Sequence, residues 1–481
     1  MAGKNKSESI LLKQSYYISK FRSLSGDIRK AIAGTDEDFT SGSISRAVML
    51  LSIPMVLEMI MESVFAVVDI YFVSKIGHEA VATVGITETL TTIIYSFAIG
   101  LSVAATAVVS RRIGEKKPEE ASHAAFQAMV TGAFASVFIA IPGIIYAEEI
   151  LVLMGLSESV VYEYSSYTGW ILVGNVIIFM LFTINAIFRG AGDAAISLRV
   201  LWFANALNII LDPVLIFGWG PFPELGISGA AIATTTGRGA AVIYQLYILF
   251  RGKGRLKLTA SKLRIDLKVI RKLVNISLGS IGQFLIATSS WIVMIRIAAE
   301  FGSTVVAGYT IGIRIMIFAL LPAMGLANAA ATLTGQNLGA KDPERAERSV
   351  WVTSKYMTFY MLLVSVLFIF FRYRLISLFI DDPAVVDVGA ELMLILGYGF
   401  IAYGIGMIVI NAINGAGDTV TPTKINFICF WLMEIPLAYI LSNEFGMEET
   451  GVFLAIVISE SIMTLLGLLA FRKGKWKTKV V

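Results

Sequence analysis

The chain has 481 residues, of which 56% are hydrophobic and only 15% are charged, and its formal net charge is +4. Soluble globular proteins carry about 25% charged residues. This composition therefore excludes an ordinary soluble protein and indicates that most of the chain lies in lipid. We expect no sizeable soluble domain.

Residues 1–43 come first and are polar, with charges of both signs. We interpret them as a partly helical cytoplasmic tail. The stretch "ILLKQSYYISKFRSL" at 10–24 also fits a second interpretation, an amphipathic helix that lies on an anionic membrane surface.

Twelve apolar stretches follow, each close to the roughly 20 residues that a membrane-spanning helix needs. The sequence therefore predicts an all-α integral membrane protein with twelve transmembrane helices, near 47–73, 80–109, 123–146, 164–188, 195–217, 227–250, 274–299, 305–334, 351–371, 386–413, 423–442 and 451–471. The single cysteine, Cys429, lies in the eleventh of them, so an intramolecular disulfide is excluded.

The first span is rich in ionisable residues, in "PMVLEMIMESVFAVVDIYF" at 54–72. Glu58, Glu62 and Asp69 share one helical face with Phe65. Each carboxylate costs about 2–3 kcal/mol in a membrane helix even on insertion scales, and such residues usually face the interior of the bundle. We interpret this stripe as functional, although Glu58 and Asp69 could also reach the headgroups from the ends of the span.

Other residues of the first span suggest how it works. Met55, Met59 and Phe65 would form a forgiving apolar wall for diverse compounds, because methionine adapts to irregular shapes. Pro54 removes one helix hydrogen bond and predicts a weak point where the helix bends.

Two short phrases mark an internal repeat, "NAIFRGAGD" at 185–193 and "NAINGAGD" at 411–418. The same offset aligns two longer segments, including their glycines and prolines, at 77–121 and 302–346. Each half then holds six spans that start on the same side of the membrane. Halves with that relation are related by an axis along the membrane normal and leave a central cleft between them.

The "GAGD" pieces lie between spans, where the glycines allow a tight turn. We expect Asp193 or Asp418 to cap the helix that follows. A nucleotide-binding turn is not indicated, because Ala195 and Val420 occupy the third glycine position of the GxGxxG spacing and no Walker A pattern occurs. An ion gradient, rather than ATP, is the expected energy source.

The fifth span contains "NIILDP" at 208–213, with Asn208 and Asp212 one turn apart. Pro213 frees a backbone carbonyl in the preceding turn. Together with Thr234 of the sixth span, these residues offer oxygen ligands that suit a proton or sodium. The alternative is that Asn208 and Asp212 only hydrogen-bond to neighbouring helices.

Other charged residues have plainer interpretations. Glu88, Arg296 and Arg314 are expected to pair within the bundle or to line its mouth. The acidic stretch "DDPAVVD" at 381–387 reads as a helix start rather than as a diphosphate-binding motif. We therefore do not expect an enzyme.

Basic residues concentrate in alternate connecting segments, above all in 251–272 and at the C-terminal end, whereas the other connections are acidic. Lys and Arg collect on the cytoplasmic side of membrane proteins. Both termini are therefore expected to be cytoplasmic. The positive charge is a topology signal and does not indicate nucleic-acid binding, which would need a basic face on a folded domain.

Several of these pieces together resemble the MATE (multidrug and toxic compound extrusion) transporters, in their prokaryotic DinF-like branch. The resemblance covers about 44–472 and rests on "VVDIYFVSKIG", "NAIFRGAGD", "NIILDP", "GISGAAIAT" and "NAINGAGDTVTP". It implies two six-helix lobes around a cleft and cation-coupled export of organic, often cationic, compounds.

The resemblance also implies roles for individual residues. Asp69 and Asp212 would be the carboxylates that bind the proton or sodium, with Asn208 and Thr234 assisting, and Pro54 would be the kink proline. Some members of the family use an acidic residue in the seventh span. This sequence has only Gln283 there, which argues against a C-lobe cation site of that type. Glu434 and Glu460 could substitute for the missing acid, but we expect them to form contacts between helices.

The resulting hypothesis is a multi-pass antiporter of the cytoplasmic (inner) membrane, and we expect it to be a monomer. It would need no cofactor beyond the coupling proton or sodium, and its partners would be membrane lipid and organic substrates. The substrate cleft is expected at Met55, Glu58, Met59, Glu62, Phe65 and Gln283. The alternative is a lipid-linked saccharide flippase of the same superfamily. The expected parts are 1–43, the N-lobe 44–250, a basic linker 251–272, the C-lobe 273–472 and the tail 473–481.

The loop charges predict the outcome of cysteine labelling in intact cells. Cysteines at Ser157 and Ser442 should react with an impermeant reagent, because both connections are expected outside. A cysteine at Lys257, in the basic linker, should not react. Labelling at Lys257 would refute this topology.

Overall fold

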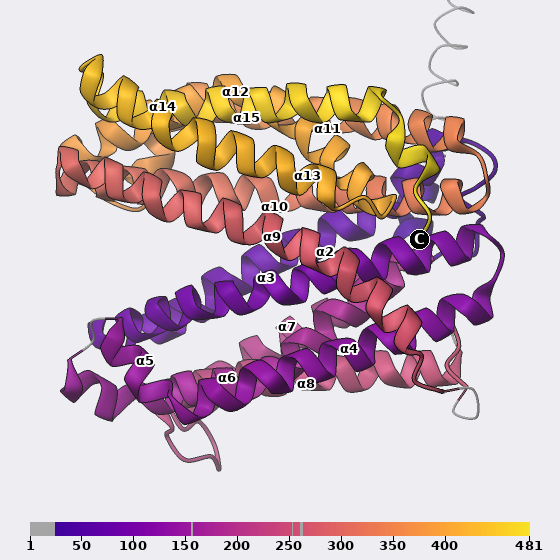
Figure 1. The fold of residues 1–481 in the computed structure, drawn as a ribbon. Helices are drawn as coiled ribbons and strands as arrows, with labels where there is room; N and C mark the ends of the chain where they lie inside the picture. Colours follow the sequence, from indigo (N-terminus) through magenta and orange to yellow (C-terminus); the bar gives the residue numbers. More distant parts are fainter. Residues whose placement is uncertain (1–24, 155–156, 253, 260–262) are drawn as a thin grey trace, which may run out of the picture.

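The computed structural model describes residues 25–481 except 155–156, 253 and 260–262, and all regular secondary structure in this part is helical. The interpretation of 10–24 as a membrane-surface helix lies outside the described residues. Two bundles lie side by side, with the N-lobe below and the C-lobe above in Figure 1.

The helices of the N-lobe run in chain order. They are α2 (Ile44–Ser74), α3 (His78–Gly114), α4 (Pro118–Ile145), the short α5 (Ala147–Leu153), α6 (Glu158–Ala191), α7 (Ala194–Ile216) and α8 (Gly226–Arg251). Residues 25–33 form one further helical stretch ahead of α2.

The C-lobe repeats this order, with one irregular span. Its helices are α9 (Leu267–Ala298), α10 (Ser303–Gly339), α11 (Pro343–Ser377), α12 (Pro383–Gly415), α13 (Val420–Asn426), η3 (Phe427–Glu434), α14 (Ile435–Tyr439), η4 (Ile440–Glu444) and α15 (Glu448–Arg472). The four pieces from α13 to η4 make a single span, in which η3 and η4 are widened π-helical turns.

The number of spans agrees with the prediction of twelve. Eleven helices in the described part are long and apolar enough to cross a membrane, counting α13 to η4 as one. The twelfth is α8, which has 26 residues but a lower hydropathy, because its middle contains the polar stretch "TTTGRG". The fold is therefore an all-α membrane protein with six spans in each of two lobes.

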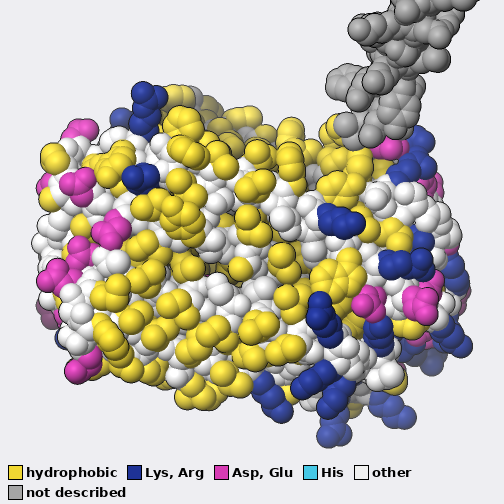
Figure 2. Space-filling model, turned by 90° about the horizontal axis from the view of Figure 1, so that it is seen from above, with side chains coloured by type: hydrophobic (Ala, Val, Ile, Leu, Met, Phe, Trp, Pro, Cys, Tyr) yellow, Lys and Arg dark blue, Asp and Glu magenta, His cyan; other side chains and the backbone are white. Residues whose placement is uncertain are grey.

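Charge separates the two ends of the molecule. Figure 2 shows a broad hydrophobic band between an end where Lys and Arg gather and an end where Asp and Glu prevail. We call the first the basic end; it is formed by the α3–α4, α8–α9 and α10–α11 connections and by residues 473–481. The other is the acidic end, where α3, α12 and α15 begin.

The lobes touch most closely at the basic end, through α3 and α10. A Cβ atom added to Gly114 would collide with the backbone of Gln336, and one added to Gly339 would collide with the Arg111 carbonyl. The Gln336 side chain also crosses between the lobes, since its Nε2 donates to the Gly190 carbonyl at 3.0 Å. Glycine is required because only a missing side chain lets two helix backbones approach this far.

The lobes separate towards the acidic end and leave a cleft. Near the basic end α2 meets α10, because a Cβ at Gly325 would contact the backbone of Met55 and Val56. Further along α2 the face that follows on from Val56 is exposed, at Ile60 (42%), Val64 (45%), Val67 (52%) and Tyr71 (56%). These residues recur at helical spacing, so one continuous stripe of α2 lines the cleft.

The helices opposite show the same change from contact to exposure. On α3, Gly100 lies against Ser277 and Ile281 of α9. About two and three helical turns away on the same face, Ile93 and Thr89 are exposed. Leu285 and Ile292 of α9 and Arg314 of α10 are exposed in the matching positions. The cleft wall is therefore mainly apolar.

The segment 34–43 fastens the two lobes at the basic end. Its Phe39 is buried, with the Arg255 guanidinium 4.7 Å from the ring centroid. Arg255 also donates to the carbonyls of Thr35 and Glu37, on the N-lobe side. Arg345 of α11 donates to the carbonyls of Phe39, Ser41 and Gly42, on the C-lobe side.

One ion pair of this segment lies in water outside the spans. The Asp38 carboxylate is 2.5 Å from Lys116 Nζ. Partial burial acts to raise the pKa of Asp38, but the hydrogen bonds from Lys116 and Thr40 outweigh it and lower that pKa to about 2. The carboxylate therefore stays charged, and the pair intact, throughout the physiological pH range.

The segment 473–481 also joins the lobes. Trp476 stacks on Phe471 of α15, with 4.7 Å between the ring centroids, which anchors the segment to the C-lobe. From the N-lobe, Arg111 and Arg112 of α3 donate to the carbonyls of Lys479 and Val481. The two segments predicted as tails therefore include stretches that connect the lobes across the basic end. We call 34–43 and 473–481 the straps.

Several smaller expectations are settled by the helix ends. Asp382 caps α12, because its side chain accepts from the Ala384 backbone N–H at 2.9 Å. Asp193 stands before α7 but does not cap it; its Oδ2 accepts instead from the Arg255 backbone N–H at 2.6 Å. Of the two residues expected to cap a helix, Asp193 therefore does not, because its carboxylate is bonded to the linker instead.

Asp418 lies before α13, and Ser442 lies in η4. Asp418 accepts from the Thr421 hydroxyl at 2.7 Å and from the Thr421 backbone N–H, so it does serve the start of α13. Ser442 has an exposed fraction of only 2%, so a cysteine there would be shielded from the labelling reagent. The neighbouring Asn443 is exposed and is the better position for the introduced cysteine.

The close approach of α3 and α10 predicts the effect of one methyl group. Gly114→Ala should destabilise the protein by about 1–3 kcal/mol, the usual cost of overpacking. Gly85→Ala is the matched control in the same helix, where a Cβ meets nothing within 4 Å; it should be neutral or stabilising by up to about 1 kcal/mol. Thermal unfolding of the purified protein in detergent measures both, and equal melting temperatures would contradict the interface.

Candidate functional site

The N-lobe contains a buried polar group where α7 crosses α8. The "NIILDP" residues place Asn208 and Asp212 on one face of α7, one turn apart, and both are almost fully buried. Asn208 Nδ2 donates to Asp212 Oδ1 at 3.2 Å and lies 3.2 Å from Thr234 Oγ1 of α8. The structure therefore brings these three predicted residues together.

This group has unused hydrogen-bonding capacity. Asp212 Oδ2 and Asn208 Oδ1 are buried and have no hydrogen-bond partner among the described residues. Buried polar atoms without partners are rare in native proteins and call for an explanation, such as a bound ion. No Lys or Arg of the described part forms an ion pair with Asp212. The group can thus accept a proton or a small cation without displacing an existing partner.

Asp69 of α2 completes the arrangement from the neighbouring helix. It is half-buried and lies close enough to Asp212 for the two carboxylates to interact electrostatically. The buried Tyr167 of α6 lies close to Asp69 as well. Two carboxylates that face each other in a low-dielectric interior repel, and a cation or proton between them removes that repulsion.

Arg238 is a central residue of the site that the sequence interpretation missed. Its Nη1 donates to the Tyr95 hydroxyl at 3.3 Å, and its guanidinium lies 5.3 Å from the Phe65 ring centroid. It also interacts electrostatically with Glu62 and Asp69. The signal was present, because Arg238 is an ionisable residue within a span and stands one turn after Thr234 on the same face.

Glu58 has a different role from the one predicted. Its exposed fraction is 1%, and Oε1 accepts from Arg189 Nη1 of α6 at 2.6 Å. The Arg189 carbonyl accepts in turn from Thr332 of α10, across the lobe interface. Glu58 is therefore half of a buried ion pair near the basic end, and it does not line the cleft in this structure.

Two other predicted cleft residues are also enclosed. Met55 is 1% exposed and belongs to the core between α2 and α10. Gln283 is buried and exchanges hydrogen bonds at 3.1 Å with Asn414, while its Nε2 donates to the Thr419 carbonyl. Neither side chain lines the open cleft, so both assignments were wrong for this conformation.

The orientation of α2 explains why its predicted stripe does not line the cleft. Glu62, Phe65 and Asp69 turn towards α7 and α8 within the N-lobe, where Arg238 lies, and Met59 is half-buried. The face that looks into the cleft is the opposite one, with Ile60, Val64, Val67 and Tyr71. Pro54 lies within α2, which is helical from Ile44 to Ser74.

The described residues contain no group of three or more His, Cys, Asp or Glu that could hold a metal ion. A site with Asp212, Asn208 and Thr234 instead offers oxygen ligands from two helices.

Comparison with known proteins identifies the family. The MatE family model matches residues 54–214 and 280–440, one match in each lobe. The chain belongs to the MatE family. This result agrees with the internal repeat, since the two matched segments have the same place in their lobes.

Solved structures agree on the architecture of this MatE protein. An outward-facing conformation of a multidrug resistance MATE family transporter of the MOP superfamily aligns with a TM-score of 0.85 at 24% identity, covering 92% of this chain and 98% of the other. A MOP superfamily transporter from Pyrococcus furiosus aligns with a TM-score of 0.86 at 24% identity and the same coverage. At this identity the likeness shows the fold alone.

Curated relatives are transporters from several bacteria. The probable multidrug resistance protein YoeA of Bacillus subtilis is 25% identical over 91% of this chain and 96% of its own length. The FAD transporter of Shewanella oneidensis is 29% identical over 88% and 93%. The probable multidrug resistance protein NorM of Thermotoga maritima is 24% identical over 91% and 94%. The chain is accordingly a multi-pass membrane transporter.

The Glu58–Arg189 pair predicts a large effect on stability. Arg189→Ala leaves the Glu58 carboxylate buried without its partner, which should cost about 3–5 kcal/mol. Arg199→Ala is the control, because Arg199 is exposed on the next helix; it should change little. Replacing both partners with apolar residues, Glu58→Leu with Arg189→Met, should recover most of the loss. Melting temperature and monodispersity in detergent measure the series, and a stable Arg189→Ala protein would contradict the pair's role.

Proposed function

We propose that this MatE protein is a cation-coupled antiporter that exports organic, mainly cationic, drugs and toxic compounds across the cytoplasmic membrane. The coupling ion is a proton or sodium, bound in the N-lobe. The observation that carries the proposal is the buried Asp212–Asn208–Thr234 group, with its unpartnered carboxylate and amide oxygens next to Asp69.

The orientation follows from charge. The basic end is cytoplasmic by the preference of Lys and Arg for that side, so the segments 34–43 and 473–481 lie inside the cell. The lobes are packed together at that end and apart at the other. On this orientation the conformation is outward-facing, and the cleft is open for release of substrate.

The cleft surface supports export of hydrophobic organic compounds. Apolar side chains from α2, α3 and α9 form most of the wall, and Glu88 of α3 supplies an exposed carboxylate. A broad apolar wall binds by burial rather than by directed hydrogen bonds, so it tolerates many shapes. The curated relatives named as multidrug resistance proteins support the same substrate class.

A second candidate substrate class is an anionic nucleotide. Arg314 of α10 is exposed on the cleft face and interacts electrostatically with Glu88 of the opposite lobe. A guanidinium in the cleft suits phosphate oxygens, and the Shewanella oneidensis relative is named an FAD transporter. Competition of FAD with a fluorescent cation in a binding assay discriminates between the two classes. The flippase alternative is not favoured, because the "NIILDP" group is present.

Coupling is proposed to act through α2. The ion bound near Asp212 also changes the charge that faces Asp69, on the part of α2 that follows Pro54. Proline leaves one helix hydrogen bond unmade, so α2 bends more easily there. An ion that prefers one shape of α2 shifts the population towards that shape, and only such a difference in affinity can drive the transition.

The proposal predicts which substitutions abolish transport. Asp69→Asn and Asp212→Asn should each reduce gradient-driven efflux of a fluorescent cation to background, because the neutral amide removes the ion-binding charge. Glu224→Gln, in an exposed connection, is the control and should retain wild-type efflux. Surface expression of all variants is measured in parallel.

Collapsing the proton and sodium gradients separately identifies the coupling ion. Efflux should stop with one of the two gradients and persist with the other. Wild-type efflux by Asp69→Asn or Asp212→Asn would remove that residue from the coupling mechanism.

A further inference from the structure

The C-lobe contains a second buried carboxyl pair, Glu434 of η3 and Glu460 of α15. Glu434 is 1% exposed, and its Oε2 accepts from the Ser290 hydroxyl of α9 at 3.0 Å. Glu460 Oε2 is buried and has no hydrogen-bond partner among the described residues. The two carboxyl groups lie close enough to interact electrostatically.

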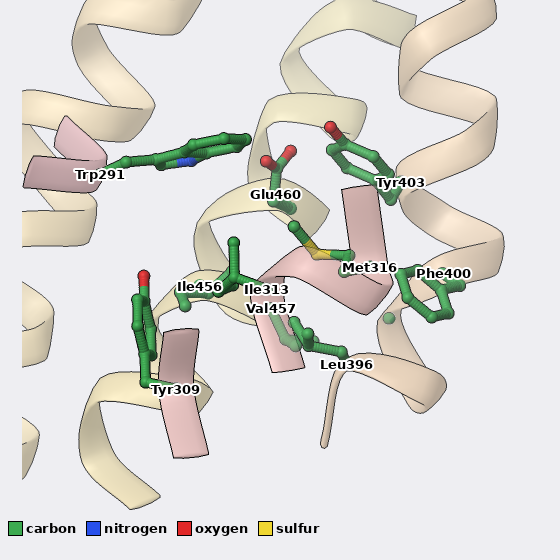
Figure 3. A pocket seen from close by; sticks show the side chains of 11 residues that line it. Trp291, Tyr309, Ile313, Met316, Leu396, Phe400, Tyr403, Ile456, Val457 and Glu460 are labelled. Carbon is green, nitrogen blue, oxygen red and sulfur yellow. The ribbon is translucent and has the colours of Figure 1, made fainter. Parts of the chain in front are cut away.

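Glu460 of this pair lines a small cavity with aromatic walls. Figure 3 shows Glu460 at this cavity with Trp291, Tyr309 and Tyr403 around it. The cavity holds about 30 Å³, enough for roughly one water molecule and too little for an organic compound. Whatever the site binds is therefore as small as a proton, a water molecule or a bare ion.

The described residues around the two carboxyl groups supply no basic partner. The titratable side chains that face them from the surrounding elements are Tyr309 of α10, Tyr403 of α12 and Cys429 of η3. All three are weak acids with ordinary pKa values above about 8, and α9 contributes only Ser290 and Trp291. Among the described residues, neither glutamate forms an ion pair. Two uncompensated anions in so apolar a place are costly.

The internal repeat places this pair where the N-lobe has its own polar group. Glu434 stands as far before the end of the second MatE match (440) as Asn208 stands before the end of the first (214). The crossing of the following helix is also repeated: Gly229 packs on the Leu215 backbone, and Gly451 packs on the Leu441 and Ser442 backbones.

Counted from these two glycines, Arg238 and Glu460 occupy the same position in their lobes. The N-lobe thus has a guanidinium at this position, whereas the C-lobe has a carboxyl group. The widened turn of η3 ends at Glu434 itself, and such π-helical turns within helices are frequent at functional sites.

We propose that Glu434 and Glu460 form a second exchangeable protonation site, in the C-lobe, that holds one proton between two carboxyl groups. A proton adds to one carboxylate oxygen, which forms an O–H bond and removes one of the two buried charges. The proton leaves to water when the surroundings again favour a negative charge on both carboxyl groups. Trp291 of α9 lines the cavity and is half-buried.

The inference deepens the proposed function, because it gives the antiporter a second ion site, but it is tested without transport. Infrared difference spectra of the purified protein between about pH 5 and pH 9 detect the carbonyl stretch of a protonated carboxylic acid. Wild-type protein should gain this band as the pH falls. Glu434→Gln and Glu460→Gln should each lose the C-lobe contribution.

Two controls make the result specific. Glu444→Gln, at an exposed position of the same span, should leave the band unchanged. Asp69→Asn with Asp212→Asn should remove the N-lobe contribution and keep that of the C-lobe, so a failure of the efflux proposal leaves this readout intact.

If either glutamine variant fails to fold, Ser290→Ala provides a second measurement. It removes the hydroxyl that donates to Glu434 and should shift the frequency of the band without abolishing it. Spectra of Glu434→Gln and Glu460→Gln identical to wild type, or a band from Ser290→Ala identical to wild type, would overturn the proposal. In those cases the pair is a permanently protonated helix contact.

Discussion

The backbone contact between α3 and α10 at the basic end is the constraint on which the rest of the molecule depends. Gly114 and Gly339 let the two helices approach without side chains between them. Once the lobes are joined there, their divergence towards the other end leaves the apolar cleft. The buried Glu58–Arg189 pair lies beside this contact, and the straps 34–43 and 473–481 cross it. A movement that separated the lobes at the basic end would have to release the contacts that join them there.

The same scarcity of water that stabilises the helices makes every buried charge conspicuous. The protein treats its charges in different ways. Glu58 is neutralised by Arg189, and Glu62 and Asp69 are balanced in part by Arg238. Among the described residues, Asp212 and Glu460 each keep a buried oxygen without a hydrogen-bond partner and form no ion pair, whereas Glu58 has one such oxygen but is ion-paired through the other. The unpartnered oxygens of Asp212 and Glu460 are the basis of the two ion sites that we propose, because an ion bound there would break no existing pair.

Much of the candidate site could be read from the chain. "NIILDP" indicated Asn208 and Asp212 on one face, and the structure joins them to Thr234 as predicted. The assignment of Met55, Glu58 and Gln283 to the substrate cleft was wrong. Helical spacing tells which residues share a face, but it does not tell which neighbouring helix that face contacts. Arg238 was overlooked beside Thr234, and Glu434 and Glu460 come from spans whose relative placement no local pattern reveals.

The sequence by itself determined the membrane class, the spans, the two-lobe repeat and the separation of basic from acidic ends. These properties follow from hydrophobic length, loop charge and repeated motifs, all of which are local. Tertiary structure alone decided which face of α2 lines the cleft, where the lobes touch, and which carboxyl groups remain without partners. Those outcomes depend on contacts between helices far apart in the chain, and a helix surface of similar apolar character on every side does not specify its neighbour.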